Sequence, residues 1–354
     1  MGKEYRKYRE GCTHHVYCKG VDGNVIFYSK QDCIYYITLF YHLSRRYGIT
    51  IRAFCIMPNH VHSNEQAPSR KDFFEFHRVL NRDFTRTYNK EHGRTGPIFM
   101  KPFGFAPKTV GKRIRENIAY IINNAKVGRL AQDIDQYKWN LMPYRNSDHP
   151  FSAELVKRKA SNPLRRSLAM LKYYYDRNMP LTYDRQRVLL KKLKPDEAMQ
   201  LTDYILSIHN CLDYEAIGSL YMNDVENAVT TARNNSGSEH DIPEDFEDYR
   251  IYNRMMKLAL ESGVDLQRCN FEGMPKKEIE RLKEQFRLAR FPVKQIRKFL
   301  HLGPGNLDRS DFANRGDFAG CGDFAGSGDS ADRGAENADN QLVKYFNTPN
   351  FKGY

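Results

Sequence analysis

Two histidines one residue apart, His60 and His62, have the types and spacing to do chemistry. They follow an apolar, β-branched stretch that predicts a strand, and we expect them at the end of that strand. Residues two apart on a strand point to the same side, so the two imidazoles can chelate one divalent ion. The spacing is equally typical of a pair of surface or hydrogen-bonded histidines, and other residues must decide between the two.

A helix predicted from Val110 to Gly128 provides those residues. Its core face is a stripe of small and β-branched side chains, Ile114, Ile118, Ile121, Ile122 and Ala125. A second stripe about a quarter turn away contains Arg113, Asn117, Tyr120 and Asn124. Tyr120 and Asn124 are one turn apart and share a face. The alternative is a tyrosine that packs at the edge of the core with its hydroxyl in water.

Several further elements are expected to position these side chains. The pattern predicts a strand over 14–20, a helix over 29–48, a strand over 49–58 and a helix over 70–93. Residues 93–107, rich in Gly and Pro, predict a hairpin or a loop. The polar stretch "SNEQAPS" at 63–69 predicts a loop. Alternating strands and helices indicate an α+β or α/β domain over 1–150, and we favour α+β.

The rest of the chain has a different character. Residues 151–302 predict an all-α domain, interrupted by a polar loop at 234–248. The segment 278–303 is typical of a helix-turn-helix that contacts DNA, although short helical hairpins are common. From Asp311 the chain repeats "DFANRG" and similar hexapeptides, so residues 303–354 are predicted to be a disordered tail.

Positive charge is concentrated in the first part of the chain. The 354 residues carry a net charge of +13, and residues 1–150 hold 25 Lys and Arg against 13 Asp and Glu. With 23 Tyr and 21 Phe in the chain, this composition is typical of proteins that bind single-stranded nucleic acid, although it also fits a solubilising surface. The candidate DNA-binding residues are Arg78, Arg82 and Arg86, one turn apart on the helix over 70–93, and Lys112, Arg113 and Arg115.

Composition also excludes some classes of protein. The seven cysteines form no CxxC pair and are odd in number, which argues against a zinc ribbon or a disulfide framework. No stretch is apolar over the length needed to cross a bilayer. We therefore expect a cytoplasmic protein without a membrane partner.

At these residues the sequence resembles the HUH-type single-tyrosine transposases, in particular the REP-associated tyrosine transposases and their insertion-sequence relatives. The motif "MPNHVH" ends at His62, and "YIINNAKVGRL" begins at Tyr120. They are followed by "YKWNLMPY", which contains the only tryptophan, Trp139. "HHV" and "HGRTGPIF" also fit, so the resemblance covers about residues 10–150. This chain departs from the family at Ala125, where a proline is usual, and at the polar 63–69, where we expect the strand to stop.

The resemblance implies a ferredoxin-like antiparallel sheet with packed helices, the HUH nuclease core. It also implies that Tyr120 is the nucleophile and that His60, His62 and Asn124 bind a metal. The implied activity is nicking and strand transfer on single-stranded or hairpin DNA through a 5′-phosphotyrosine. An oxygen ligand and room for phosphate favour Mg²⁺ or Mn²⁺ over zinc. A tyrosine with a pKa of about 10 needs a polarised phosphate or an adjacent base to attack at neutral pH.

Two other functions stay open. A catalytically silent, domesticated DNA-binding protein would keep the fold and the basic surface without the metal site. A rolling-circle initiator or relaxase would share the chemistry but usually carries other flanking motifs. The sequence leaves the DNA target, the role of 151–302 and the oligomeric state open, including a homodimer.

Overall fold

A four-stranded antiparallel sheet forms the centre of the protein. The structure is a computed structural model that describes residues 7–234 and 248–303. The strands lie in the order β2-β3-β1-β4, so β3 and β1 are central. Their bounds are β1 (Thr13–Lys19), β2 (Thr50–Met57), β3 (His60–Gln66) and β4 (Gly104–Lys108). The predicted α+β class and the strands over 14–20 and 49–58 are confirmed. The stretch over 93–107 forms no hairpin of its own, because β4 pairs with β1.

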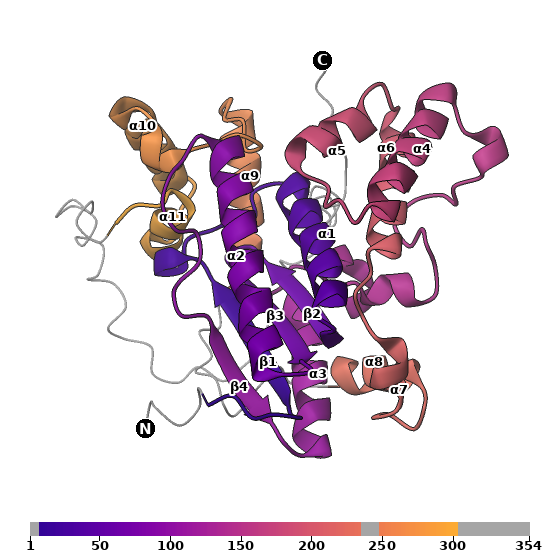
Figure 1. Cartoon of the computed structure of the whole chain (residues 1–354). Coiled ribbons are helices and arrows are strands. Elements are labelled where there is room, and N and C mark those ends of the chain that lie inside the picture. The colour runs from indigo at the N-terminus through magenta and orange to yellow at the C-terminus, as the bar shows by residue number, and fades with distance from the viewer. Residues whose placement is uncertain (1–6, 235–247, 304–354) are drawn as a thin grey trace, which may run out of the picture.

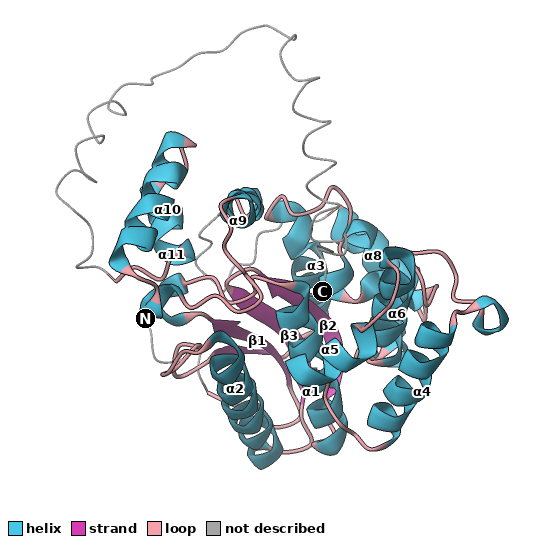
Figure 2. Cartoon of the chain, turned by 90° about the horizontal axis from the view of Figure 1, so that it is seen from above, coloured by secondary structure: helices cyan, strands magenta, loops and turns pink. Residues whose placement is uncertain are grey.

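Helices cover both faces of this sheet (Figures 1 and 2). On one face lie α1 (Lys30–Arg46) and α2 (Arg70–His92), joined where the Tyr35 hydroxyl donates to the carbonyl of Asp83 at 3.0 Å. The other face carries α3 (Gly111–Val127). All three helices were predicted. Ser29 caps α1, and Gly93 ends α2 in the left-handed conformation that favours glycine.

The polar stretch after His62 is not a loop, and this prediction was wrong. Only two residues separate β2 from β3, so His60 begins β3 rather than ending β2. Ser63 to Gln66 pair with strands on both sides. Glu65 and Asn64 are fully buried and satisfied, Glu65 by His77 of α2 at 2.8 Å and Asn64 by Asn117 of α3 at 2.7 Å. Because buried polar groups are stable when paired, a central strand tolerates this sequence.

Helices form all the regular elements of the described part of 151–303, as predicted. They are α4 (Asn162–Asp176), α5 (Tyr183–Leu190), α6 (Pro195–Ile208), α7 (Tyr214–Gly218), α8 (Val225–Arg233), α9 (Arg250–Glu261), α10 (Lys276–Leu288) and α11 (Val293–Phe299). Short 3-10 turns occur at Val21–Gly23, Ile134–Gln136, Lys138–Asn140, Met142–Arg145, Lys157–Lys159 and Phe271–Gly273. Most of the loop predicted at 234–248 and the repeats from Asp311 lie outside the described residues.

The helices after residue 150 pack directly on the elements before it. Leu212 forms a bridge to Ile51 at the outer edge of β2, and the Tyr28 hydroxyl donates to the carbonyl of Phe299. Buried apolar side chains from both parts belong to one continuous core. The division into domains at residue 150 stays a prediction. In the described part of the chain, no helix combines the length and apolarity that crossing a bilayer requires.

The predicted helix-turn-helix exists as two short helices, α10 and α11. The second helix is seven residues long, and Phe299 and the following Leu300 are fully buried. The amide of Val25 also donates to the carbonyl of Lys298 at 3.0 Å, which ties this helix to the loop after β1. The inner face of α11 is thus occupied by the protein itself and is closed to a DNA groove.

Candidate active site

Four aromatic and imidazole rings meet where α3 crosses β1 and β3. The ring of Tyr120 lies 5.8 Å from that of His62 and 5.7 Å from that of His15, centroid to centroid. His60 packs edge-on against His62 at 4.6 Å. Strand alternation places His60 and His62 on one face of β3, and α3 covers that face. The structure thus brings together the predicted nucleophile and both predicted metal ligands.

The protonation of His60 follows from its neighbour in the turn, Asn59. The side-chain nitrogen of Asn59 donates to the carbonyl of Gly23 at 3.0 Å, so its oxygen must point the other way. That oxygen lies 2.6 Å from Nδ1 of His60. An oxygen of this kind only accepts, hence Nδ1 carries the proton and Nε2 of His60 keeps its lone pair. This second contact is typical of histidines that bind a metal.

His62 is held by a third histidine, His15 on β1. Nε2 of His15 and Nδ1 of His62 are 2.8 Å apart. Burial, followed by the charges of neighbouring cationic groups, lowers the pKa of His62 well below its usual range. The pKa of His60 is lowered to about 3, mainly by burial. Both rings are therefore neutral at physiological pH, the form in which imidazole binds a metal.

Asn124 lies one turn beyond Tyr120 on α3. Asn117 is bonded to Asn64, and Tyr120 contacts His62, so α3 runs antiparallel to β3. The same progression brings Asn124 toward the His60 end of the strand. Its terminal amide nitrogen is buried, with no hydrogen-bond partner in the described part of the chain.

These residues fit a divalent metal. The two ends of an amide are hard to distinguish by shape, and exchanging them would give the orphaned Asn124 position an oxygen ligand. Together with two neutral imidazoles, this is a donor set of two nitrogens and one oxygen. Within residues 7–234 and 248–303, no group of three or more His, Cys, Asp or Glu side chains has metal-binding geometry. His15 is therefore not a third ligand.

Other residues around the site were missed by sequence reasoning. On β1, Tyr17 pairs with His62 and Lys19 pairs with His60 across the sheet. The alternation of β1 places both on the face of His15, and this signal was readable in the sequence. Tyr249, which precedes α9, lies 5.7 Å from His60. Nothing in the sequence links Tyr249 to the site.

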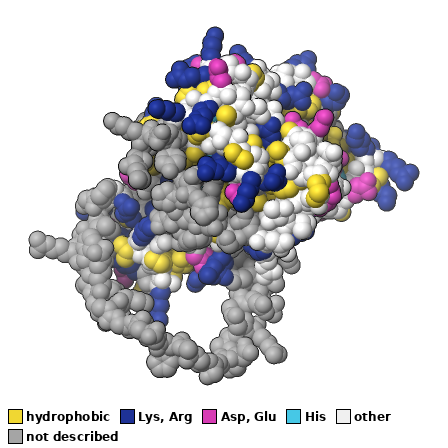
Figure 3. All heavy atoms as spheres, turned by 90° about the horizontal axis from the view of Figure 1, so that it is seen from below, with side chains coloured by type: hydrophobic (Ala, Val, Ile, Leu, Met, Phe, Trp, Pro, Cys, Tyr) yellow, Lys and Arg dark blue, Asp and Glu magenta, His cyan; other side chains and the backbone are white. Residues whose placement is uncertain are grey.

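The predicted DNA-binding residues fall on two different sides of the sheet. Arg78, Arg82 and Arg86 are exposed on α2, on the face opposite Tyr120, and each makes an ion pair with Glu75 or Asp83. Lys112, Arg113 and Arg115 are exposed on the first turns of α3, the helix that carries Tyr120. Seen from the end where α3 begins, the surface carries many Lys and Arg side chains with fewer acidic ones among them (Figure 3).

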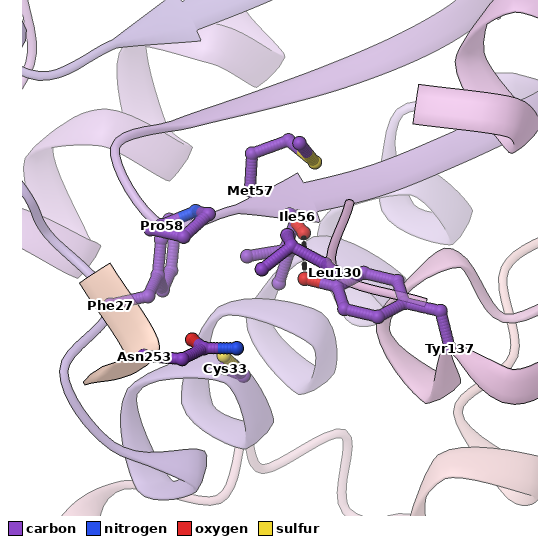
Figure 4. Close-up of a pocket in the computed structure, with 8 residues that line it drawn as sticks. All are labelled: Phe27, Cys33, Ile56, Met57, Pro58, Leu130, Tyr137 and Asn253. Atoms are coloured by element: carbon purple, nitrogen blue, oxygen red, sulfur yellow. Dashed lines mark hydrogen bonds between the residues drawn. The ribbon is translucent and has the colours of Figure 1, made fainter. Parts of the chain in front are cut away.

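A small cavity lies behind the turn that carries the histidines (Figure 4). Its volume is about 10 Å³, room for about one water molecule. It is lined by Met57, Pro58 and Asn253, among others, and the Tyr137 hydroxyl donates to the carbonyl of Ile56 at 2.7 Å beside it. None of the predicted site residues lines this cavity, so it is separate from the candidate active site.

Comparison with known proteins adds little to this geometry. No protein-family model matches the chain, and no curated protein matches it. Among solved structures, a REP-associated tyrosine transposase bound to a REP hairpin is similar, at 17% identity and a TM-score of 0.36. The alignment covers 40% of this chain and 84% of that one. A likeness of this size does not establish the family.

Proposed function

We propose that this protein is a transposase-like enzyme that nicks and joins single-stranded or hairpin DNA, with Tyr120 as the nucleophile. The observation that carries the proposal is the meeting of Tyr120 with His60 and His62 on one face of the sheet. These residues come from two elements more than fifty positions apart. The pairing of a tyrosine with two neutral histidines suits attack on a phosphodiester.

We further propose that the sheet is the ferredoxin-like core of an HUH nuclease. The first four strands and two helices follow the order β1-α1-β2-β3-α2-β4, and the strands lie in the order β2-β3-β1-β4. This succession supports the ferredoxin-like assignment. In this topology both central strands face α3, which is why His15, His60 and His62 can share one site.

In the proposed reaction the Tyr120 oxygen attacks phosphorus, and the bond from phosphorus to the 3′-oxygen breaks. The products are a 5′-phosphotyrosine and a free 3′-hydroxyl. The phenol proton has to leave, and His15 is the imidazole outside the proposed metal set that contacts the Tyr120 ring. Because the new phosphodiester keeps the energy of the old one, a second 3′-hydroxyl can reverse the step without ATP.

His60, His62 and Asn124 would hold the metal, which we propose is Mg²⁺ or Mn²⁺. Bound there, a divalent ion would neutralise the charge of the scissile phosphate. The chain's own contribution is to keep both imidazoles neutral through burial, and to orient them through Asn59 and His15. An amide oxygen in the set favours a hard ion.

One observation favours a second function, a DNA-binding protein without catalysis. In the described residues the site offers only two histidines and an amide, with no carboxylate ligand. Such a set binds hard ions weakly. A silent protein would still bind hairpin DNA and would never form a covalent product.

The deciding experiment incubates the full-length protein with single-stranded hairpins from the flanks of its own gene and Mn²⁺ or Mg²⁺. We expect a protein-DNA adduct that survives denaturing electrophoresis, is removed by a protease and is absent with EDTA. Hairpin binding without any adduct, over all flanking sequences and both metals, would identify the silent protein instead.

A further inference from the structure

Two lysines distant in the chain converge beside His60. Lys19 is the cross-strand partner of His60 on β1, and Lys298 belongs to α11 near the end of the described chain. A Cβ atom built on Gly23 would lie 3.2 Å from Cε of Lys298 and 3.7 Å from Cε of Lys19. The two side chains therefore run past the same glycine, toward one place.

The position of Lys298 is set by the backbone around it. The amide of Val25 donates to the carbonyl of Lys298 at 3.0 Å, and Nε2 of His301 donates to the carbonyl of Val25 at 2.7 Å. The Tyr28 hydroxyl donates to the carbonyl of Phe299. These three bonds dock α11 on the loop that follows β1, and the side chain of Lys298 is only 4% exposed.

Two charges so close to a neutral histidine change its electrostatics. The pKa of His60 is lowered to about 3, first by burial and then by the positive charges of Lys19 and Lys298. Both ammonium groups thus act on the imidazole proposed to bind the metal. Two cations oppose a third in the same place unless an anion accompanies it, because like charges repel in a buried site.

Gly23 and Asn59 connect this lysine pair to the histidines. Gly23 has a φ of +72°, in the left-handed region that favours glycine, and its Cβ would press on Lys298. Its carbonyl accepts from the Asn59 side chain, whose oxygen orients His60. One turn therefore sets both the lysines and the histidine.

We propose that Lys19 and Lys298 form an anion pocket beside His60 that binds the phosphate of a DNA strand. This inference rests on the proposed function and deepens it, because it names how the scissile phosphate is held. A lysine ammonium is a compact charge with three donors and is a common phosphate ligand in proteins. The helical part of the chain thereby supplies a residue to the site, so residues 1–150 hold only half of the pocket.

The pocket is tested first by binding, without catalysis. The probes are oligothymidylates of eight nucleotides with either a 5′-phosphate or a 5′-hydroxyl, titrated into the full-length protein without metal. We expect the wild type to prefer the phosphorylated probe by about tenfold, the size of a charged hydrogen bond. Lys298→Met and Lys19→Met should each reduce that preference severalfold, while Lys277→Met, an exposed lysine of α10, should leave it unchanged.

Lys298 is buried, so folding is controlled separately. Lys298→Arg keeps the charge and should retain most of the preference, and Lys19→Met changes a half-buried residue. Thermal melting and circular dichroism identify any variant that has lost its fold. An equal preference in the wild type and in folded Lys19→Met would overturn the pocket.

The adduct assay separates this pocket from the proposed function. If the wild type forms the adduct and both methionine variants form it as fast, the function stands and the pocket is wrong. If no adduct forms but the phosphate preference depends on both lysines, the pocket stands and the nicking activity is wrong. In the case where both hold, the variants should form the adduct about tenfold more slowly.

Discussion

The side-chain oxygen of Asn59 lies 2.6 Å from Nδ1 of His60, and its nitrogen donates to the carbonyl of Gly23. A single amide thus joins the loop after β1 to the first residue of β3. The contact forces the proton of His60 onto Nδ1 and leaves Nε2 to bind a ligand. Asn59 therefore controls the site without belonging to it.

Replacing Asn59 with Ala should weaken Mn²⁺ binding by about tenfold, because nothing then orients the His60 ring from outside the metal site. It should also lower the free energy of unfolding by about 1–3 kcal/mol, since the buried Gly23 carbonyl loses its donor. Calorimetric titration and denaturant unfolding measure the two effects. Asn89→Ala is a matched control, because Asn89 donates to the carbonyl of Gly96 at 2.8 Å away from the histidines. Equal metal binding in both variants would contradict this role.

Tyr120→Phe should abolish the covalent adduct and leave hairpin binding within about twofold, because only the nucleophilic oxygen is removed. The informative control is Tyr17→Phe, since the Tyr17 ring lies 6.4 Å from that of His62. Tyr17→Phe should keep the adduct. If the two variants exchange these results, the nucleophile lies on β1 instead of α3.

The two basic sets should differ in their effect on DNA binding. Replacing Lys112, Arg113 and Arg115 with Ala should reduce the slope of log affinity against log salt by about 0.7 for each DNA phosphate that the variant no longer binds. Replacing Arg78, Arg82 and Arg86 should change it less, because these arginines already pair with acids and lie across the sheet from Tyr120. Binding of a labelled single strand at several salt concentrations provides both slopes. A larger change from the α2 set would place the DNA on the other face.

Stability should fall in mild acid because of buried neutral histidines. Burial lowers the pKa of His209 to about 3, whereas an unfolded histidine has a pKa of about 6.5. The stabilisation from the neutral ring is complete above about pH 6.5 and is lost as the pH falls toward 3, because only the unfolded chain gains the proton. In that window, His209→Gln should flatten the pH dependence of the unfolding free energy by about 1 kcal/mol per pH unit. Denaturant unfolding from pH 7 to pH 5 tests this, and an unchanged slope would contradict it.

Local pattern was enough for much of this protein. The 3.6-residue spacing of Phe73, Phe84 and Tyr88 predicted α2 and its buried face, and Gly93 marked its end. The alternation of a strand was enough to place His60 and His62 on one side. These features depend on neighbours a few residues apart, so the sequence alone determines them.

The polar residues of β3 depended on the tertiary structure. Ser63 to Gln66 carry no apolar alternation, and they form a central strand because Glu65 finds His77 and Asn64 finds Asn117. Those partners lie on α2 and α3, so no local pattern could reveal them. A buried polar group is stable only once its partner is in place.

The surroundings of the site were also decided by the tertiary structure. His15 and Lys19 reach His62 and His60 through the pairing of β1 with β3, and Lys298 arrives from the far end of the described chain through the docking of α11. Sequence spacing determined which residues could do chemistry. Strand register and helix packing decided which of them meet, because contacts between distant segments form only when the whole core is assembled.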